Sequence, residues 1–196
     1  MDFNITLENK RVRLQPLQLA DFEALKPIAL LPELWKVALN AIDDGAALQG
    51  YLEKAVQDRQ RQAAIPFLVF DKQKRCVAGS TRFMAIDLPN KRVEIGSTWI
   101  HPSLQGTGLN KAMKYAMLQY AFETAGLNRV ELKTDERNQL SQNAMRSIGA
   151  QYEGTLRQHA ITSSGFVRNT MYFSILAAEW PDVKRRIFAQ YDFVTG

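Results

Sequence analysis

The apolar positions follow two different spacings along the chain, and the changes between them mark the expected elements. Runs rich in β-branched and aromatic residues predict strands at 10–14, 65–70, 76–84, 93–100, 130–134, 151–161 and 168–175. Spacings of three and four predict helices at 20–25, 48–59, 109–121, 138–148 and 182–190. Pro27 is expected to end the first helix, and Asp44 or Gly45 to cap the second. Short turns join the strands between residues 65 and 100, which predicts an antiparallel meander.

One stretch joins a strand to a helix through a glycine-rich turn. The strand 93–100 is followed by Gln105-Gly-Thr-Gly108, and a helical stripe begins at Leu109. Glycines let the backbone turn sharply and approach a ligand, while the first free N–H groups of a helix attract anions. The stretch therefore predicts a phosphate-binding turn, with a tight turn that holds no ligand as the open alternative. The spacing does not match a Walker loop, and Lys111 stands where a dinucleotide-binding loop requires its third glycine.

The strands on either side of this helix are predicted to be parallel neighbours. Residues 93–100, the helix and residues 130–134 form a strand–helix–strand succession, which favours a right-handed crossover. The glycine turn would then lie at the carboxyl end of the sheet, where open α/β sheets bind ligands. We therefore expect an α/β (α+β) fold with a mixed, mainly antiparallel central sheet and flanking helices. The expected organisation is one domain at 10–180, followed by a C-terminal helix and tail at 181–196.

The glycine turn also resembles a known cofactor loop. The pattern Gln/Arg-x-x-Gly-x-Gly/Ala, between a strand and a helix, is the acetyl-CoA pyrophosphate loop of the GCN5-related N-acetyltransferases (GNAT). Gln105 and Gly108 match this pattern, and Asn110 stands at its last small position. The motif His-Pro-x-x-Gln-Gly-Thr-Gly-x-Asn, which begins here at His101, resembles the motif of one branch of this family, the ribosomal-protein N-terminal alanine acetyltransferases (RimJ/RimL-like). The resemblance extends over residues 10–180.

This resemblance implies the acyl-CoA acyltransferase fold, in which the parallel strand pair splays apart and the pantetheine arm of acetyl-CoA lies in the gap. Acetyl-CoA is then the co-substrate. The motif Asn138-x-x-Ser141, on the following helix, is similar to the family's next motif. The residues that the resemblance assigns to the cofactor are Trp99, Ile100 and His101 on the strand, Gln105, Gly106, Thr107, Gly108, Leu109, Asn110 and Lys111 in the loop, and Asn138 and Ser141 on the next helix.

Acetyl transfer to an amine needs a group that takes the amine proton, and Glu94 is the first candidate. It lies in an otherwise apolar strand, where a carboxylate is costly unless it is paired or functional. Related enzymes often place a glutamate on this strand. The alternatives are a structural ion pair of Glu94 with Arg82 or Arg92, a base that acts through water, and His159 as the base.

A second group must protonate the sulfur that leaves. Ser141 is the candidate, because the ribosomal-protein acetyltransferases place a serine of this motif near the thiol. Asn138, three residues earlier on the same helix face, would bind the pantetheine. Many relatives use a tyrosine on this helix, but residues 138–148 contain none, and Tyr172 is expected to be a packed aromatic residue.

Composition narrows the remaining classes of protein. The chain has 196 residues and a net charge of +5, and its basic residues are spread rather than massed, so nucleic-acid binding is not expected. No apolar run approaches the length of a membrane span, and Cys76 is the only cysteine, expected to be buried. With two histidines and no cysteine cluster, no metal site is expected. We expect a cytoplasmic protein and leave a homodimer open.

The acceptor of the acetyl group is expected to be a primary amine, most simply the N-terminal amine of a protein or peptide. A small amine such as a polyamine, an amino acid or an antibiotic is the first alternative, and a non-catalytic CoA-binding module is the second. In the family, the acceptor side of the cleft corresponds here to residues 27–47 and 162–168. A groove open at both ends would favour a peptide, and a closed pocket a small amine.

Overall fold

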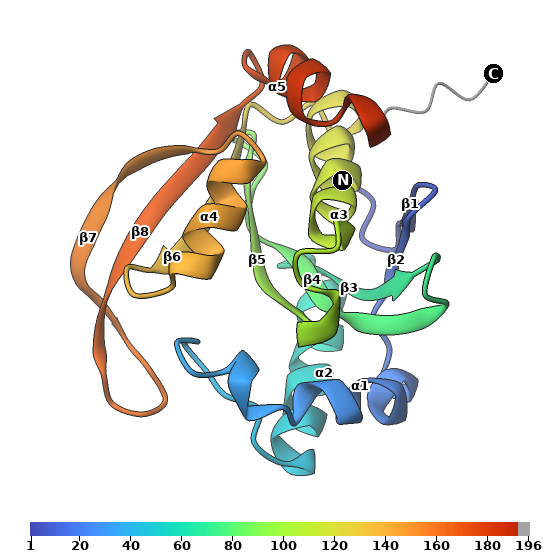
Figure 1. Cartoon of the computed structure of the whole chain (residues 1–196), viewed down its shortest axis with the longest axis vertical. Coiled ribbons are helices and arrows are strands. Elements are labelled where there is room, and N and C mark those ends of the chain that lie inside the picture. The colour runs from blue at the N-terminus through green and yellow to red at the C-terminus, as the bar shows by residue number, and fades with distance from the viewer. Residues whose placement is uncertain (192–196) are drawn as a thin grey trace.

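The computed structural model describes residues 1–191 as one eight-stranded mixed sheet with helices on both faces (Figure 1). The strand order across the sheet is β1-β2-β3-β4-β5-β6-β8-β7. The strands are β1 (Leu7–Glu8), β2 (Val12–Pro16), β3 (Ile65–Asp71), β4 (Cys76–Asp87), β5 (Arg92–Ile100), β6 (Arg129–Asp135), β7 (Gln151–Ile161) and β8 (Val167–Leu176). All neighbours are antiparallel except β5 and β6, which are parallel. This confirms the predicted fold class.

Five α-helices are described within residues 1–191. They are α1 (Phe22–Ala29), α2 (Gly45–Gln60), α3 (Leu109–Gln119), α4 (Gln139–Ser147) and α5 (Trp180–Ile187). Helix α3 continues into one turn of π-helix at Tyr120–Thr124. Short 3-10 turns occur at Leu19–Asp21, Pro32–Leu34, Pro102–Leu104 and Ala189–Tyr191. None of the helices in this described part is long and apolar enough to cross a membrane.

The parallel strands β5 and β6 pair over only three residues of each. Arg92, Val93 and Glu94 lie opposite Arg129–Glu131, and no pairing follows beyond Glu94. On its other edge, β5 stays paired with β4 as far as Ile100. A bulge at Ser97, with a φ of 45°, bends β5 where the two parallel strands part. One edge of β5 is therefore open from Ile95 onward.

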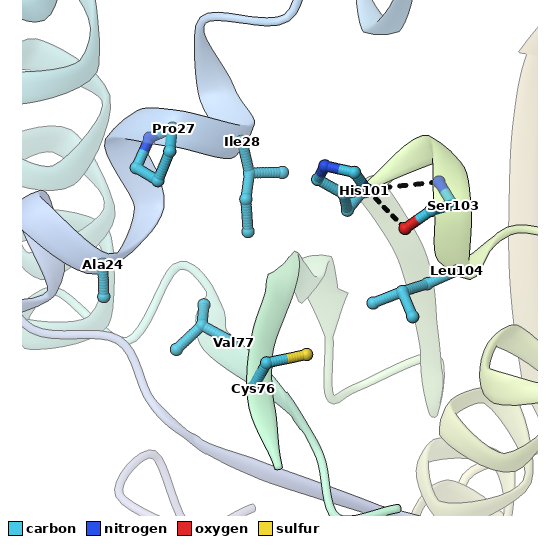
Figure 2. A pocket seen from close by; sticks show the side chains of 8 residues that line it. All are labelled: Ala24, Pro27, Ile28, Cys76, Val77, His101, Ser103 and Leu104. Atoms are coloured by element: carbon cyan, nitrogen blue, oxygen red, sulfur yellow. Dashed lines mark hydrogen bonds between the residues drawn. The ribbon is translucent and has the colours of Figure 1, made fainter. Parts of the chain in front are cut away.

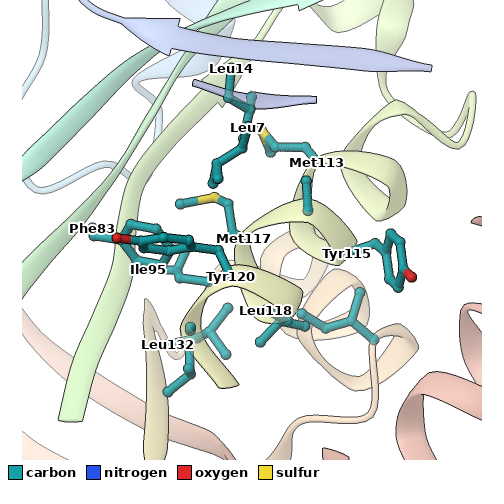
Figure 3. Packing of buried hydrophobic residues seen from close by; sticks show 14 of the residues in the cluster. Leu7, Leu14, Phe83, Ile95, Met113, Tyr115, Met117, Leu118, Tyr120 and Leu132 are labelled. Atoms are coloured by element: carbon teal, nitrogen blue, oxygen red, sulfur yellow. The ribbon is translucent and has the colours of Figure 1, made fainter. Parts of the chain in front are cut away.

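Each face of the sheet carries its own hydrophobic core, because successive strand residues point to opposite faces. Phe67 and Val69 pack in the cluster under α3, while Leu68 between them packs in the cluster with α1 and α2. In the larger cluster, the ring of Phe83 lies beside that of Tyr120, which continues α3, with ring centroids 6.0 Å apart (Figure 3). Helix α3 is thus fixed against the middle of the sheet by its own apolar face.

The local signals at helix ends were partly correct. Asp44 caps α2, since its Oδ1 accepts from the backbone N–H of Ala47 at 2.7 Å. The prediction that Pro27 ends the first helix was wrong, because α1 continues through Pro27 to Ala29. A proline removes a single backbone donor, and the buried contacts of Ile28 and Ala29 hold the last turn in place.

Both ends of the described part of the chain, residues 1–191, pack on the central sheet or on α3. Strand β1 pairs with β2, and Leu7 joins the large cluster. Trp180 and Val183 of α5 join the same cluster, and Nε1 of Trp180 donates to Glu123 at 2.7 Å. The terminal helix expected at 182–190 therefore begins and ends earlier, at Trp180–Ile187, while residues 192–196 of the expected tail lie outside the described residues.

One charged residue lies in this core without a charged partner. Lys114 of α3 is 5% exposed, and its Nζ donates to Oγ1 of Thr98 at 2.9 Å. Within residues 1–191 no carboxylate forms an ion pair with it. Burial lowers the pKa of Lys114 to about 7, because the charged form loses its water shell.

This residue makes the stability of the protein depend on pH. Between about pH 7 and pH 10.5 the unfolded chain binds a proton at Lys114 that the folded chain has lost, so the free energy of unfolding rises with pH over that window. We expect Lys114→Met to be more stable than the wild type at pH 7, with the difference shrinking towards pH 10.5. Urea unfolding of both proteins at several pH values measures it. Lys54→Met, at an exposed site of α2, is the matched control, and a difference independent of pH would contradict the expectation.

Candidate active site

The glycine turn forms an open row of backbone donors at the start of α3. Gly106 and Gly108 have φ angles of 72° and 88°, in the left-handed region that favours glycine. Oγ1 of Thr107 donates to the carbonyl of Leu104 at 2.7 Å, which holds the turn closed on its inner side. A side chain at Gly106 would meet no atom within 4 Å, so this part of the turn faces open space. The first N–H groups of α3 have no partner inside the helix, so the turn fits the diphosphate of acetyl-CoA.

Basic residues surround a surface hollow beside this turn. The hollow, of about 530 Å³, is lined by Lys10, Arg11 and Lys72 together with Thr107, Gly108, Gln190 and Tyr191. Arg11 is held in place by Asp71 at 2.9 Å. Asp71 pairs with Arg11 and Glu8 pairs with Lys72, so these cations lie beside the turn with carboxylates that offset part of their charge.

A second hollow, of about 520 Å³, lies before the turn and is mainly apolar (Figure 2). It is lined by Ala24, Pro27 and Ile28 of α1, by Cys76 and Val77 of β4, and by His101, Ser103 and Leu104. Nδ1 of His101 lies 2.8 Å from the hydroxyl of Ser103 and accepts from its backbone N–H at 3.2 Å. Cys76 is half-buried rather than buried as expected, because it is the first residue of β4 and its side chain lines this open hollow.

The strand residues expected to bind the pantetheine arm do not all have free backbone groups. The N–H of His101 donates to the carbonyl of Ala78 at 2.8 Å, so it is not available to a ligand. Because neighbouring residues of a strand point their backbone groups to opposite edges, Ile100 faces the open edge. Its carbonyl accepts only a long bond of 3.4 Å from the side chain of Gln105. Ile100 is therefore the residue of this group with backbone groups free to pair with an amide of the arm.

Glu94 lies at the closed end of the gap, where the pairing of β5 and β6 stops. It is 9% exposed, and its Oε2 lies 2.8 Å from Nζ of Lys133 on β6. The ion pair weighed from the sequence therefore exists, but its partner is Lys133. Arg92 pairs with Asp87 and Glu131 instead, and Arg82 lies 3.8 Å from Asp58.

Lys133 links Glu94 to the hairpin of β7 and β8. Its Nζ lies 4.6 Å from the ring centroid of Tyr172, and that ring lies edge-on to His159 at 5.8 Å. Burial alone would lower the pKa of Lys133, but the hydrogen bond and charge of Glu94 raise it, so that the net pKa lies above its ordinary value. The two candidate bases, Glu94 and the exposed His159, thus lie at opposite ends of one row of side chains, Glu94–Lys133–Tyr172–His159, which we call the polar row.

The polar row includes residues that sequence reasoning missed. Lys133 was not considered, although charged residues recur at every second position of β6, at 129, 131, 133 and 135. This alternation places them on the same face of the sheet as Glu94, so it was a usable signal. Tyr172 lies opposite Lys133 in the β6–β8 register, which the sequence does not show.

Asn138 and Ser141 lie together at the start of α4. Oδ1 of Asn138 accepts from the backbone N–H of Ser141 at 3.0 Å, so Asn138 is the N-cap of α4. Its side-chain NH₂ group is left for other partners. The hydroxyl of Ser141 is half-buried and has no hydrogen-bond partner among residues 1–191.

The expected acceptor side joins two segments far apart in the chain. The N–H of Ser163, at the tip of the β7–β8 hairpin, donates to the carbonyl of Leu39 at 2.9 Å. Trp35 lies edge-on to Trp99 of β5 at 5.8 Å, and Tyr51 of α2 lies at 5.9 Å from the same ring. The loop before α2 is therefore fixed both to the hairpin and to the face of β5 that carries Glu94.

A glycine turn that opens a helix, an open strand edge and a buried carboxylate at the end of the gap are the features expected of an acyl-CoA-dependent transferase. A family model described as "Acetyltransferase (GNAT) domain" matches residues 11–151, and the chain belongs to this family. It is therefore an N-acetyltransferase that uses acetyl-CoA as co-substrate and an amine as acceptor. Within residues 1–191, no group of side chains could hold a metal ion.

Individual relatives agree with this family. The Bacillus subtilis (strain 168) protein named "Putative ribosomal N-acetyltransferase YdaF" is 30% identical over 139 residues, which cover 68% of this chain and 73% of that protein. A crystal structure of a GCN5-related N-acetyltransferase from Brucella melitensis is 27% identical, with a TM-score of 0.87 over 95% of this chain and 85% of the other. Mycobacterium smegmatis RimJ in complex with CoA-disulfide is 19% identical, with a TM-score of 0.81 over 96% of each chain, and shares the fold.

The coupling of Glu94 to Lys133 can be measured directly. Glu94→Gln removes the main contribution that raises the pKa of Lys133 and leaves its burial, so the pKa of Lys133 should fall below the wild-type value. Carbon-13 NMR of labelled lysine side chains, titrated against pH, measures the shift. Glu53→Gln, on α2, is the control and should leave Lys133 unchanged. An unchanged Lys133 titration in Glu94→Gln would mean that the pair does not form in solution.

Proposed function

We propose that this protein acetylates the N-terminal amine of a protein or peptide. The observation that carries the proposal is the polar row, which begins at buried Glu94 beside the gap and ends at exposed His159. An extended acceptor could follow such a row with its amine at Glu94 and its chain leading outward. The Bacillus subtilis relative is named "Putative ribosomal N-acetyltransferase YdaF", and this name supports the same class of acceptor.

The residues of the chain divide the reaction among them. The backbone of residues 106–111 and the positive end of α3 hold the diphosphate, and the open edge at Ile100 aligns the arm. Asn138 offers its NH₂ group to the arm, and Lys111 adds a positive charge near the turn. Glu94 accepts the proton of the attacking amine while Lys133 keeps its carboxylate in place. Such fixed groups orient the amine towards the thioester carbon.

Replacing the base tests the catalytic part of the proposal. Glu94→Gln keeps the shape of the side chain and removes proton acceptance, so kcat should fall by about 10²–10⁴-fold. Acetyl-CoA affinity should stay close to the wild-type value, because Glu94 lies away from the glycine turn. Thiol release measures kcat, and calorimetry measures affinity.

His159→Gln is the matched control on the other end of the polar row, and we expect it to lose much less activity than Glu94→Gln. A larger loss of kcat in His159→Gln than in Glu94→Gln would contradict Glu94 as the base and favour His159. Tight binding of acetyl-CoA without thiol release from any amine would instead support the non-catalytic CoA-binding module.

The acceptor class is tested by a panel of amines. Short peptides with differing first residues should release thiol with a kcat/KM well above that of polyamines, free amino acids and aminoglycosides, because only a peptide can occupy the polar row as well as the position beside Glu94. Peptides with a blocked N-terminus and an internal lysine are the control and should be poor substrates. A small amine that exceeds every peptide would contradict the proposed acceptor.

Two further expectations belong to this proposal. The cytoplasm, where nascent protein N-termini and acetyl-CoA meet, is the proposed location. A homodimer is proposed through β7, which is the edge strand of the sheet and exposes Tyr152, Leu156 and Ile161.

A further inference from the structure

The buried Lys114 lies directly beneath the open edge of β5. Its hydrogen-bond partner Thr98 is exposed and belongs to the stretch of β5 that has no β6 neighbour. Along the strand, Thr98 lies between Glu94 at the closed end of the gap and Ile100 near the glycine turn. Nζ of Lys114 is therefore hydrogen-bonded to a residue of the open edge, along which the thioester arm is proposed to lie.

The hydroxyls around Lys114 leave its ammonium group able to donate further. Lys114 donates to Oγ1 of Thr98, which lies 2.8 Å from Oγ1 of Thr81. Oγ1 of Thr81 in turn donates to Sδ of Met117 at 3.8 Å. With Thr81 donating to Met117, the hydroxyl of Thr98 donates to Thr81, so both hydroxyl hydrogens point away from the lysine. Among residues 1–191 Thr98 is the one hydrogen-bond acceptor of Lys114, so two N–H groups of a protonated ammonium have no acceptor in this part of the chain.

A buried lysine without a counter-ion is costly, and such groups are found where a ligand supplies the missing charge. Lys114 bonds the hydroxyl of Thr98 on β5, which continues to the hydroxyl of Thr81 on β4 and the thioether of Met117, and none of these groups is charged. Acetyl transfer places negative charge in this gap first on the acetyl oxygen, as the amine adds, and then on the sulfur, as the C–S bond breaks. Of these two atoms, only the sulfur must also gain a proton. The arrangement provides a cationic donor for the charge on sulfur.

We propose that Lys114 is a catalytic residue, the general acid that protonates the leaving sulfur. The inference rests on the proposed acetyl transfer. The acceptor nitrogen bonds to the acetyl carbon and loses its proton to Glu94. The C–S bond breaks with its electron pair on sulfur, and the sulfur takes a proton directly from one of the two Lys114 N–H groups that do not bond Thr98. Solvent then returns a proton to Lys114 and removes one from Glu94, so the enzyme is restored.

Lys114 is better suited to this step than Ser141. A serine hydroxyl is a very weak acid, whereas a general acid works best when its pKa lies near the pH of the reaction. The pKa of Lys114, lowered by burial to about 7, meets that condition. Ser141 then remains a hydrogen-bonding residue for the arm.

The kinetic test uses Lys114→Met, which keeps the volume and removes the proton donor, with Lys54→Met as control. We expect kcat to fall by about 10²–10⁴-fold in Lys114→Met and not in the control. The alkaline decrease of the wild-type kcat, which reports loss of the Lys114 proton, should be absent in the variant. A variant with wild-type kcat and the same alkaline decrease would overturn the proposal.

A second test uses the wild-type protein and does not depend on turnover or on the folding of a variant. Lysine side chains are labelled with carbon-13, and the Lys114 signal is followed while CoA or desulfo-CoA, which lacks the sulfur, is added. We expect CoA to shift the Lys114 signal and its pKa more than desulfo-CoA does. Equal responses to the two ligands, or no binding of CoA, would overturn the proposal. If the Lys114 response depends on the sulfur but no amine causes thiol release, the proposed acetyl transfer is contradicted. The contact between Lys114 and the CoA sulfur is then still supported.

Discussion

The early end of the pairing between β5 and β6 is the constraint on which the site depends. Only three residues of each strand are paired, and from Ile95 onward the backbone of β5 has hydrogen bonds on one edge only. An unpaired strand edge inside a protein needs partners for its N–H and C=O groups. The glycine turn that follows β5 directs the first N–H groups of α3 to the same side. The open edge and the turn follow each other in the chain, and together they supply the backbone groups that we propose bind an extended, phosphate-bearing ligand.

Within residues 1–191, the charged residues around this gap are of two kinds: most are paired with an opposite charge, and one is not. On β6 and β7, charges are paired: Arg129 bonds both Glu131 and Glu153, and the pKa of Glu153 is lowered to about 2 mainly by that arginine. Glu94 is paired as well, with Lys133, but at the position where the gap ends. Lys114 alone among these groups is buried against neutral partners. A paired charge holds strands together, while a buried unpaired cation is stable only at the expense of folding free energy.

Much of this architecture could be predicted from the sequence, because it depends on local signals. The spacing of apolar residues predicted the meander and α3, Asp44 predicted the start of α2, and the two glycines predicted a sharp turn, which the structure forms with left-handed backbone at both. These features arise from residues close together in the chain. The resemblance of the loop to an acetyl-CoA site added the cofactor, which the spacing alone left open.

The remaining features depend on contacts between distant segments. The partner of Glu94 is Lys133, set by the register of two parallel strands, and the link between Leu39 and Ser163 joins a loop to a hairpin more than a hundred residues away. The continuation of α1 through Pro27 depends on the burial of Ile28 and Ala29. Lys114 has apolar neighbours along α3, but a lysine in a helix is ordinarily expected at the surface. Its burial becomes apparent only when α3 is packed on β4 and β5.

The central claim is that the backbone N–H groups after β5 hold the diphosphate of acetyl-CoA. Nitrogen-15 NMR of the uniformly labelled protein, titrated with acetyl-CoA, tests it most directly. The account predicts that the amide signals of residues 106–111 shift in a saturable way, together with that of Ile100, and more strongly than those of α2. Binding of acetyl-CoA that leaves the amides of Gly106 and Gly108 unshifted would contradict it.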